Sequence, residues 1–117
     1  MTVNTHPSIS QRPIKYAAVS GATSGNNTLV AAVTGKKIRV LGLCIKAASA
    51  VAVRLEDGAG GTALTGVTSL VANGDLGWTL PLNLAGWCET SAATLLNMEL
   101  GGAVQVSGVL TYQEVDA

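Results

Sequence analysis

Residues 55–66 (LEDGAGGTALTG) contain the glycine spacing that some nucleotide-binding enzymes use to hold a phosphate. Gly58, Gly60 and Ala63 match the pattern G-x-G-x-x-[GA] after a short apolar run. That pattern works where its last small residue opens a helix, because the helix N-terminus then meets the pyrophosphate. Here residues 64–68 (LTGVT) are rich in β-branched residues and glycine, which make a poor first helical turn. We interpret the loop as a connection between strands and expect no cofactor.

A second phosphate-binding motif is incomplete. The sequence Thr34-Gly35-Lys36 resembles the end of a phosphate loop, but Lys37 stands where Ser or Thr would bind magnesium. The first glycine of that motif is also missing, because its position is occupied by Val30. We therefore expect no nucleotide site here either.

The residues that could act as bases, nucleophiles or metal ligands are few and scattered. The single histidine, His6, lies near the N-terminus, so no Ser-His or Cys-His pair can be assembled in the core, and we expect no enzyme. Glu56 and Asp57 are adjacent, so at most one points to a given face of a strand, and we expect solvated turn charges. Cys44 and Cys88 form no metal-binding cluster. Cys44 is expected to be a buried thiol, with a Cys44–Cys88 disulfide as the alternative under oxidising conditions.

The two tryptophans, Trp78 and Trp87, have two interpretations. Large aromatic rings most often fill a core or an interface. Alternatively they form a sugar-stacking platform, which requires exposed rings with polar groups nearby.

Composition indicates one small domain that associates with other copies or with a larger assembly. The chain has 117 residues, zero net charge, 12% charged residues, 48% hydrophobic residues and no Phe. Such a domain exposes apolar surface unless something covers it; the alternative is a monomer with a thin core. The charge balance predicts no nucleic-acid partner. No apolar run is long enough to span a bilayer and the N-terminus is polar, so we expect no membrane partner and synthesis in a cytosol.

Strand signals separated by Gly, Asn or Asp repeat along the chain after an extended arm at residues 1–13, with the main domain at 14–117. This spacing is typical of an all-β sandwich of about eight short antiparallel strands, such as a jelly roll. The expected strands are residues 16–20, 28–33, 37–46, 50–56, 67–71, 76–80, 94–100 and 103–115. We expect Gly101-Gly102 to join the last two strands as a hairpin.

The strand at 37–46 (KIRVLGLCIK) is apolar on both sides in its middle, which indicates a central strand or a subunit contact. We therefore expect a subunit interface that uses Arg39, Leu41, Leu43 and Ile45. By contrast, residues 50–56 alternate cleanly, as in a half-buried strand whose inner face carries Val51, Val53 and Leu55.

Four features together resemble a group of small tailed-phage virion proteins, over about residues 15–115. They are a KIRVL strand, a GAGGT loop and an AGW segment, followed by a final strand ending in TY. The resemblance implies a jelly-roll capsid decoration, or cement, protein of the virion surface. Its partners would be the major capsid protein and further copies of itself, as a trimer rather than a dimer. The resemblance implies no catalytic or metal-binding residues.

A flexible arm can reach a neighbouring capsomer, so we expect Arg12, Pro13 and Lys15 to contact the capsid. A receptor- or glycan-binding module of a tail fibre is the alternative function. An engineered capsid-display scaffold is a further alternative.

Overall fold

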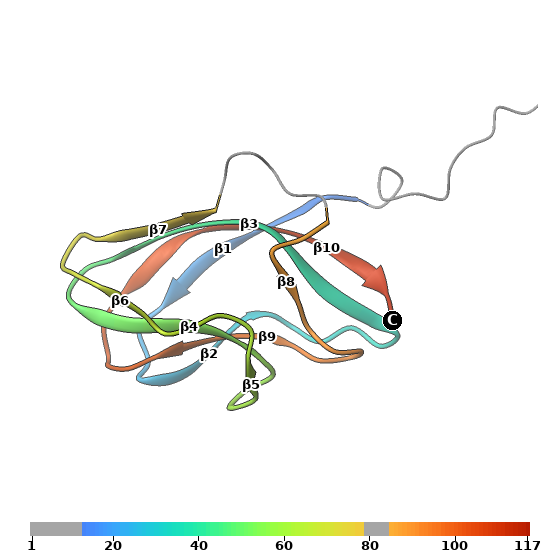
Figure 1. Ribbon diagram of the computed structural model, residues 1–117, viewed down its shortest axis with the longest axis horizontal. Helices are drawn as coiled ribbons and strands as arrows, with labels where there is room; N and C mark the ends of the chain where they lie inside the picture. The colour runs from blue at the N-terminus through green and yellow to red at the C-terminus, as the bar shows by residue number, and fades with distance from the viewer. Residues whose placement is uncertain (1–12, 79–84) are drawn as a thin grey trace, which may run out of the picture.

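The computed structural model describes residues 13–78 and 85–117, which form ten strands and no helix (Figure 1). The predictions for Arg12 and residues 1–12, and for residues 79–84, lie outside the described residues. The strands are β1 (Lys15–Gly21), β2 (Gly25–Val30), β3 (Lys36–Ala47), β4 (Val51–Asp57), β5 (Thr62–Ala63), β6 (Thr68–Leu70), β7 (Asp75–Trp78), β8 (Cys88–Glu89), β9 (Leu96–Leu100) and β10 (Val106–Asp116).

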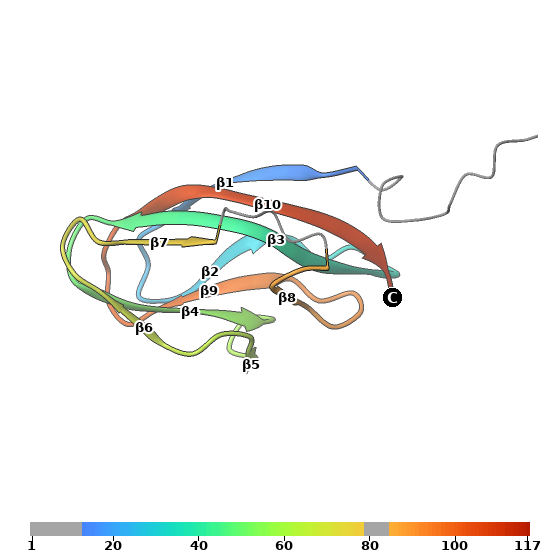
Figure 2. The ribbon, with the colours of Figure 1, turned by 45° about the horizontal axis from the view of Figure 1, so that its top comes forward.

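The strands form two antiparallel sheets that pack as the two layers of a sandwich (Figure 2). The β1 sheet has the order β1-β10-β3-β7, with β8 also paired to β3. The β2 sheet has the order β2-β9-β4-β5, with β6 also paired to β4. The pairs β1–β10, β2–β9, β3–β7 and β4 with β5 and β6 are nested along the chain, which is the order of a jelly roll. The predicted all-β jelly-roll sandwich is confirmed.

The core follows from alternation along the strands. On β4 the inward residues Val51, Val53 and Leu55 are buried, as their spacing predicts. The inner faces of β9 and β10 contribute further large side chains to one contiguous cluster; they include Leu96, Met98, Leu100, Val106 and Leu110.

A β-bulge in the β3–β10 pair explains the apolar run of β3. Thr111 pairs with Gly42 and Tyr112 pairs with Val40, so Leu41 is the extra residue. A bulge shifts the alternation of its strand by one position. Ile38 faces the core before the bulge, and Leu43 and Ile45 face it after the bulge. The run looks two-sided in the sequence because its phase changes in the middle.

Two local expectations are wrong. Gly101-Gly102 does not close a hairpin, because β9 pairs with β2 and β4 while β10 pairs with β1 and β3. These glycines instead carry the chain from one sheet to the other, and a turn sequence cannot distinguish the two cases. The second strand also begins three residues earlier than expected, at Gly25, because the turn before it is short.

Candidate functional site

The glycine-rich loop is a tight connection between β4 and β5. The N–H of Gly61 donates to the carbonyl of Gly58 (3.0 Å), and Gly58 and Gly60 have φ values of 87° and 66°. A Cβ on Gly61 would lie 1.8 Å from the carbonyl oxygen of Asp57, so this position requires glycine. The chain continues into β5, so the interpretation as a strand connection is confirmed.

This loop reaches across the outer face of the β2 sheet to Asn26 on β2. The N–H of Gly60 donates to Oδ1 of Asn26 at 3.0 Å. The Nδ2 group of Asn97, on β9, donates to the same oxygen at 3.0 Å. The loop backbone is therefore engaged by the chain's own side chains, whereas a phosphate-binding loop leaves its N–H groups free for the ligand.

Beneath the loop lies a polar cluster that the sequence analysis missed, formed by Arg54, Glu56, Asn97 and Asn26. Glu56 is fully buried, so its assignment as a solvated turn charge is wrong. Its Oε2 accepts a hydrogen bond from Arg54 Nε at 2.7 Å and lies 2.6 Å from Arg54 Nη2 in an ion pair. Its Oε1 accepts a hydrogen bond from Asn97 Nδ2 at 2.8 Å. The Arg54 guanidinium neutralises the carboxylate, so the two side chains form a structural ion pair.

Asp57 points to a different neighbour. Its two carboxylate oxygens accept hydrogen bonds from the N–H of Ser91 at 2.8 Å and the hydroxyl of Ser91 at 2.5 Å. The adjacent carboxylates thus lie apart, as their alternation predicts. Through these bonds to Ser91, Asp57 holds the β8–β9 connection against the end of β4.

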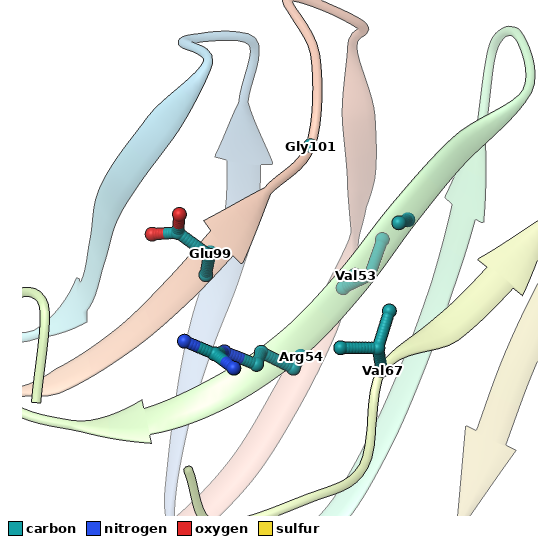
Figure 3. A pocket seen from close by; sticks show the side chains of 6 residues that line it. Val53, Arg54, Val67, Glu99 and Gly101 are labelled. Atoms are coloured by element: carbon teal, nitrogen blue, oxygen red, sulfur yellow. The ribbon is translucent and has the colours of Figure 1, made fainter. Parts of the chain in front are cut away.

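A shallow hollow opens on the outer face of the β2 sheet, next to the polar cluster (Figure 3). Arg54 from β4 and Glu99 from β9 point to the same side, opposite Val67. Ala52, Val53 and Gly101 complete the lining. Its volume of about 130 Å³ is smaller than the few hundred Å³ typical of small-molecule sites.

The residues expected to contact the capsid are only partly described. Pro13 is exposed, and Lys15 begins the edge strand β1. The Nζ of Lys15 donates to Oε2 of Glu114 on β10 at 3.0 Å. This hydrogen bond raises the pKa of Lys15 above its usual value. Lys15 therefore stays protonated at neutral pH and is held against β10.

The residues expected at a subunit interface are mostly inside the chain itself. Leu41, Leu43 and Ile45 are at most 1% exposed. Arg39 forms an ion pair with Glu89 on β8 (3.5 Å). A subunit contact on β3 would have to use its outward side chains instead, such as those of Cys44 and Lys46.

Both cysteines are free thiols. Cys44 is exposed, so the expectation of a buried thiol is wrong, whereas Cys88 packs against the core. Cys88 pairs with Val40, four residues from Cys44 along β3, or about 13 Å at 3.3 Å per residue. A disulfide needs Cα atoms within about 7 Å, so the structure does not contain the alternative Cys44–Cys88 bond. Burial, followed by the nearby Glu89, raises the pKa of Cys88 to about 11.

Trp87 is 43% exposed, and its indole N–H donates to the carbonyl of Leu41 at 2.9 Å. The ring is thus anchored by its polar edge while part of its surface faces outward. The side chain of Trp78 lies outside the described part of the chain.

No family model matches the chain, and a search of curated proteins gives no match. Across residues 13–78 and 85–117, no helix is long and apolar enough to cross a membrane. The same residues contain no group of three or more His, Cys, Asp or Glu side chains that could hold a metal ion.

Proposed function

We propose that this chain is a structural virion protein that binds the outer surface of a phage capsid and stabilises the head shell. The observation that carries the proposal is the jelly-roll strand order, which extends over the same residues that resemble small phage virion proteins. Many unrelated functions use this fold, so the fold does not by itself indicate a function. It supports a structural role in combination with those sequence motifs.

The surface supports a binding role. Several large apolar side chains are exposed: Ile14, Tyr16, Val67, Val71, Trp87 and Val109. Meanwhile several of the few charges are paired within the chain, as in Lys36 with Asp116 and Arg54 with Glu56. A small surface with paired charges and exposed apolar groups fits protein contacts better than electrostatic capture of a charged ligand.

The mechanism would be thermodynamic. A protein that binds the closed shell but not its loosened state shifts the equilibrium toward the closed shell by mass action. At a free concentration of about 100 times Kd, each bound copy contributes about 2.7 kcal/mol. An oligomer that engages several capsomers at once would add avidity.

The test is to add labelled protein to particles of the parent phage from which the native copy has been removed, and to locate it by electron microscopy. Regular density over the head shell is the expected result. Label confined to the tail tip would refute decoration. We expect a chain that begins at Pro13 to keep the fold and lose shell binding; unchanged binding would exclude residues 1–12 from the contact.

Lys15 and Glu114 offer a matched pair of variants for the same assay. If the Lys15 ammonium contacts the shell, Lys15→Gln weakens binding. Glu114→Gln removes the same intramolecular ion pair but leaves the ammonium free, so it should bind at least as well as the parent chain. Equal loss in both variants would mean that the ion pair, and not a shell contact, is what matters.

Trp87 favours a second candidate, a glycan-binding module of a tail fibre. An exposed ring whose N–H is already satisfied by Leu41 is a rigid stacking surface. Quenching of tryptophan fluorescence by a host glycan in the parent chain, together with calorimetric binding that Trp87→Ala abolishes and Trp87→Phe retains, would support this candidate over decoration.

A further inference from the structure

The edges of the two sheets differ in how well they are protected. Unpaired edge strands invite pairing with other chains, and proteins usually make them short, irregular or charged. The β7, β8, β5 and β6 strands have between two and four residues each. The edge strand β2 has a register shift between Thr28 and Val30. In contrast to these strands, β1 has seven residues and pairs with β10 without any register shift.

The composition of β1 (KYAAVSG) also lacks the usual protection. It has no proline, and its one charge, Lys15, is occupied by the ion pair with Glu114. Its outward side chains are Tyr16, Ala18 and Ser20, all exposed, with Tyr16 at 72%. Within the described residues, no strand pairs with the second side of β1.

Backbone hydrogen bonds show which way the groups of β10 point. The N–H of Ala48 donates to the carbonyl of Gln105 (2.9 Å), one step beyond the β10–β3 ladder. Backbone groups of a strand alternate between its two neighbours, so every second residue of β10 counted from Gln105 bonds to β3. On the other side of β3, the N–H of Ala47 donates to the carbonyl of Gly74 (3.0 Å), as this alternation requires. The intervening residues of β10, which include Gly108, point to β1.

The register of β1 against β10 shows which backbone groups of β1 point to the open edge. Val19 lies opposite Gly108, so the N–H and C=O of Val19 point to β10. The alternate residues of β1 therefore direct their N–H and C=O groups to the open side. These residues are Tyr16, Ala18 and Ser20.

From this geometry we infer that β1 pairs antiparallel with β1 of a second copy of this chain, about a two-fold axis at Ala18. Ala18 is the midpoint of Lys15–Gly21, so this register overlaps the whole strand. It places Tyr16 opposite Ser20 of the second copy and forms about six backbone hydrogen bonds. The two β1 sheets become one continuous sheet across the axis.

The side chains suit that pairing. At the axis Ala18 meets Ala18, so no bulky or charged groups face each other. Lys15 lies opposite Gly21 of the second copy, which avoids a like-charge pair. Tyr16, which is 72% exposed, lies on the outer face at this edge and gains cover from the neighbouring copy.

The contact is isologous, because the same strand is used on both sides, so it closes at two copies. It therefore predicts a dimer, or a larger assembly built from dimers, where the sequence analysis favours a trimer. A trimer would need a different edge as the partner of β1.

The test combines sedimentation equilibrium with amide hydrogen exchange on the full chain. We expect a mass twice that of one chain at high concentration, with slow exchange at the Tyr16, Ala18 and Ser20 amides that becomes fast on dilution. A trimer mass, a monomer at high concentration, or protection of these amides in a monomer would each overturn the proposal.

Ala18→Pro provides the decisive variant. It removes an N–H that points to the open side, so the β1–β10 ladder is kept, but it deletes the two central bonds between copies. We expect the dimer to dissociate at least about thirtyfold more readily. If this variant does not fold, Ala18→Lys places two ammonium groups at the axis and tests the same contact. Thr111→Lys, on the same face but off the edge, is the matched control and should remain dimeric; equal effects of both lysines would refute edge pairing.

Discussion

Replacing Arg54 by methionine should destabilise the fold because it leaves the buried Glu56 carboxylate without its cation. Glu56 is 0% exposed, and Arg54 contacts its Oε2 through a hydrogen bond from Nε at 2.7 Å and an ion-pair contact from Nη2 at 2.6 Å. The hydrogen bond from Asn97 comes from a neutral group and remains. Methionine keeps most of the apolar stem of arginine, so the change mainly removes the charge.

The structure sets the size of the effect and an asymmetry. Stranding a buried charge costs about 3–5 kcal/mol. Arg54 is 37% exposed, so water can reach the site in the variant, and we expect the lower end, about 3 kcal/mol. Glu56→Met leaves behind a cation that is already partly solvated, so it should cost less, about 1–2 kcal/mol. The double variant should be more stable than Arg54→Met alone, because no charge is stranded.

Urea unfolding followed by circular dichroism measures these differences as shifts in midpoint at constant m-value. Because small domains have about 5–15 kcal/mol of stability, a loss of 3 kcal/mol is easily resolved. The reasoning is refuted if Arg54→Met costs less than Glu56→Met, or if the double variant is no more stable than Arg54→Met. Either result would mean that the glycine-rich loop opens readily and Glu56 is solvated after all.

Three further predictions concern backbone packing, thiol reactivity and the pH dependence of stability. A Cβ on Gly108 would lie 1.8 Å from the carbonyl oxygen of Cys44, so Gly108→Ala should cost more than about 3 kcal/mol in thermal or urea unfolding. Gly102→Ala, where a Cβ meets nothing within 4 Å, should change stability by less than about 0.5 kcal/mol; similar losses would contradict the close approach. In alkylation followed by mass spectrometry at pH 8, Cys44 should react while Cys88, with its pKa of about 11, stays protected, and equal rates would contradict this placement. Since burial raises the pKa of Cys88 from its ordinary value of 9.0 to about 11 in the folded form, stability should fall as pH rises from about 9 to 11, measured by urea unfolding across this range.

The sequence predicts the fold well where alternation is regular. On β4 and β9 the inner and outer residues follow directly from period two, and the structure buries the inner set, including Val53 and Met98. The prediction fails on β3 because a bulge at Leu41 changes the phase, and nothing local in the sequence marks it. It also fails at Gly101-Gly102, because a turn sequence does not encode which sheet the next strand joins.

The polar cluster shows why the candidate site was harder to predict than the fold. Alternation correctly places Glu56 on the outer face of β4, and outer residues of a two-layer sandwich are normally wet. The glycine-rich loop covers this face through a bond from Gly60 to Asn26, which lies 34 residues earlier in the chain. A contact of that kind depends on the order of strands in the sheet, which the strand pattern alone does not fix.

The loop that covers the polar cluster also helps to explain how an apolar, weakly charged chain can be stable. Part of its outer surface is covered by its own connections, as the loop over Glu56 and the Trp87 bond to Leu41 show. Self-covering of this kind reduces the need for a partner on the outer face of the β2 sheet. It does not extend to β1, where Tyr16 and Ala18 have exposed side chains on the outer face and direct their N–H and C=O groups to the open edge. The exchange rate of the Ala18 amide therefore measures directly whether a second copy covers this edge.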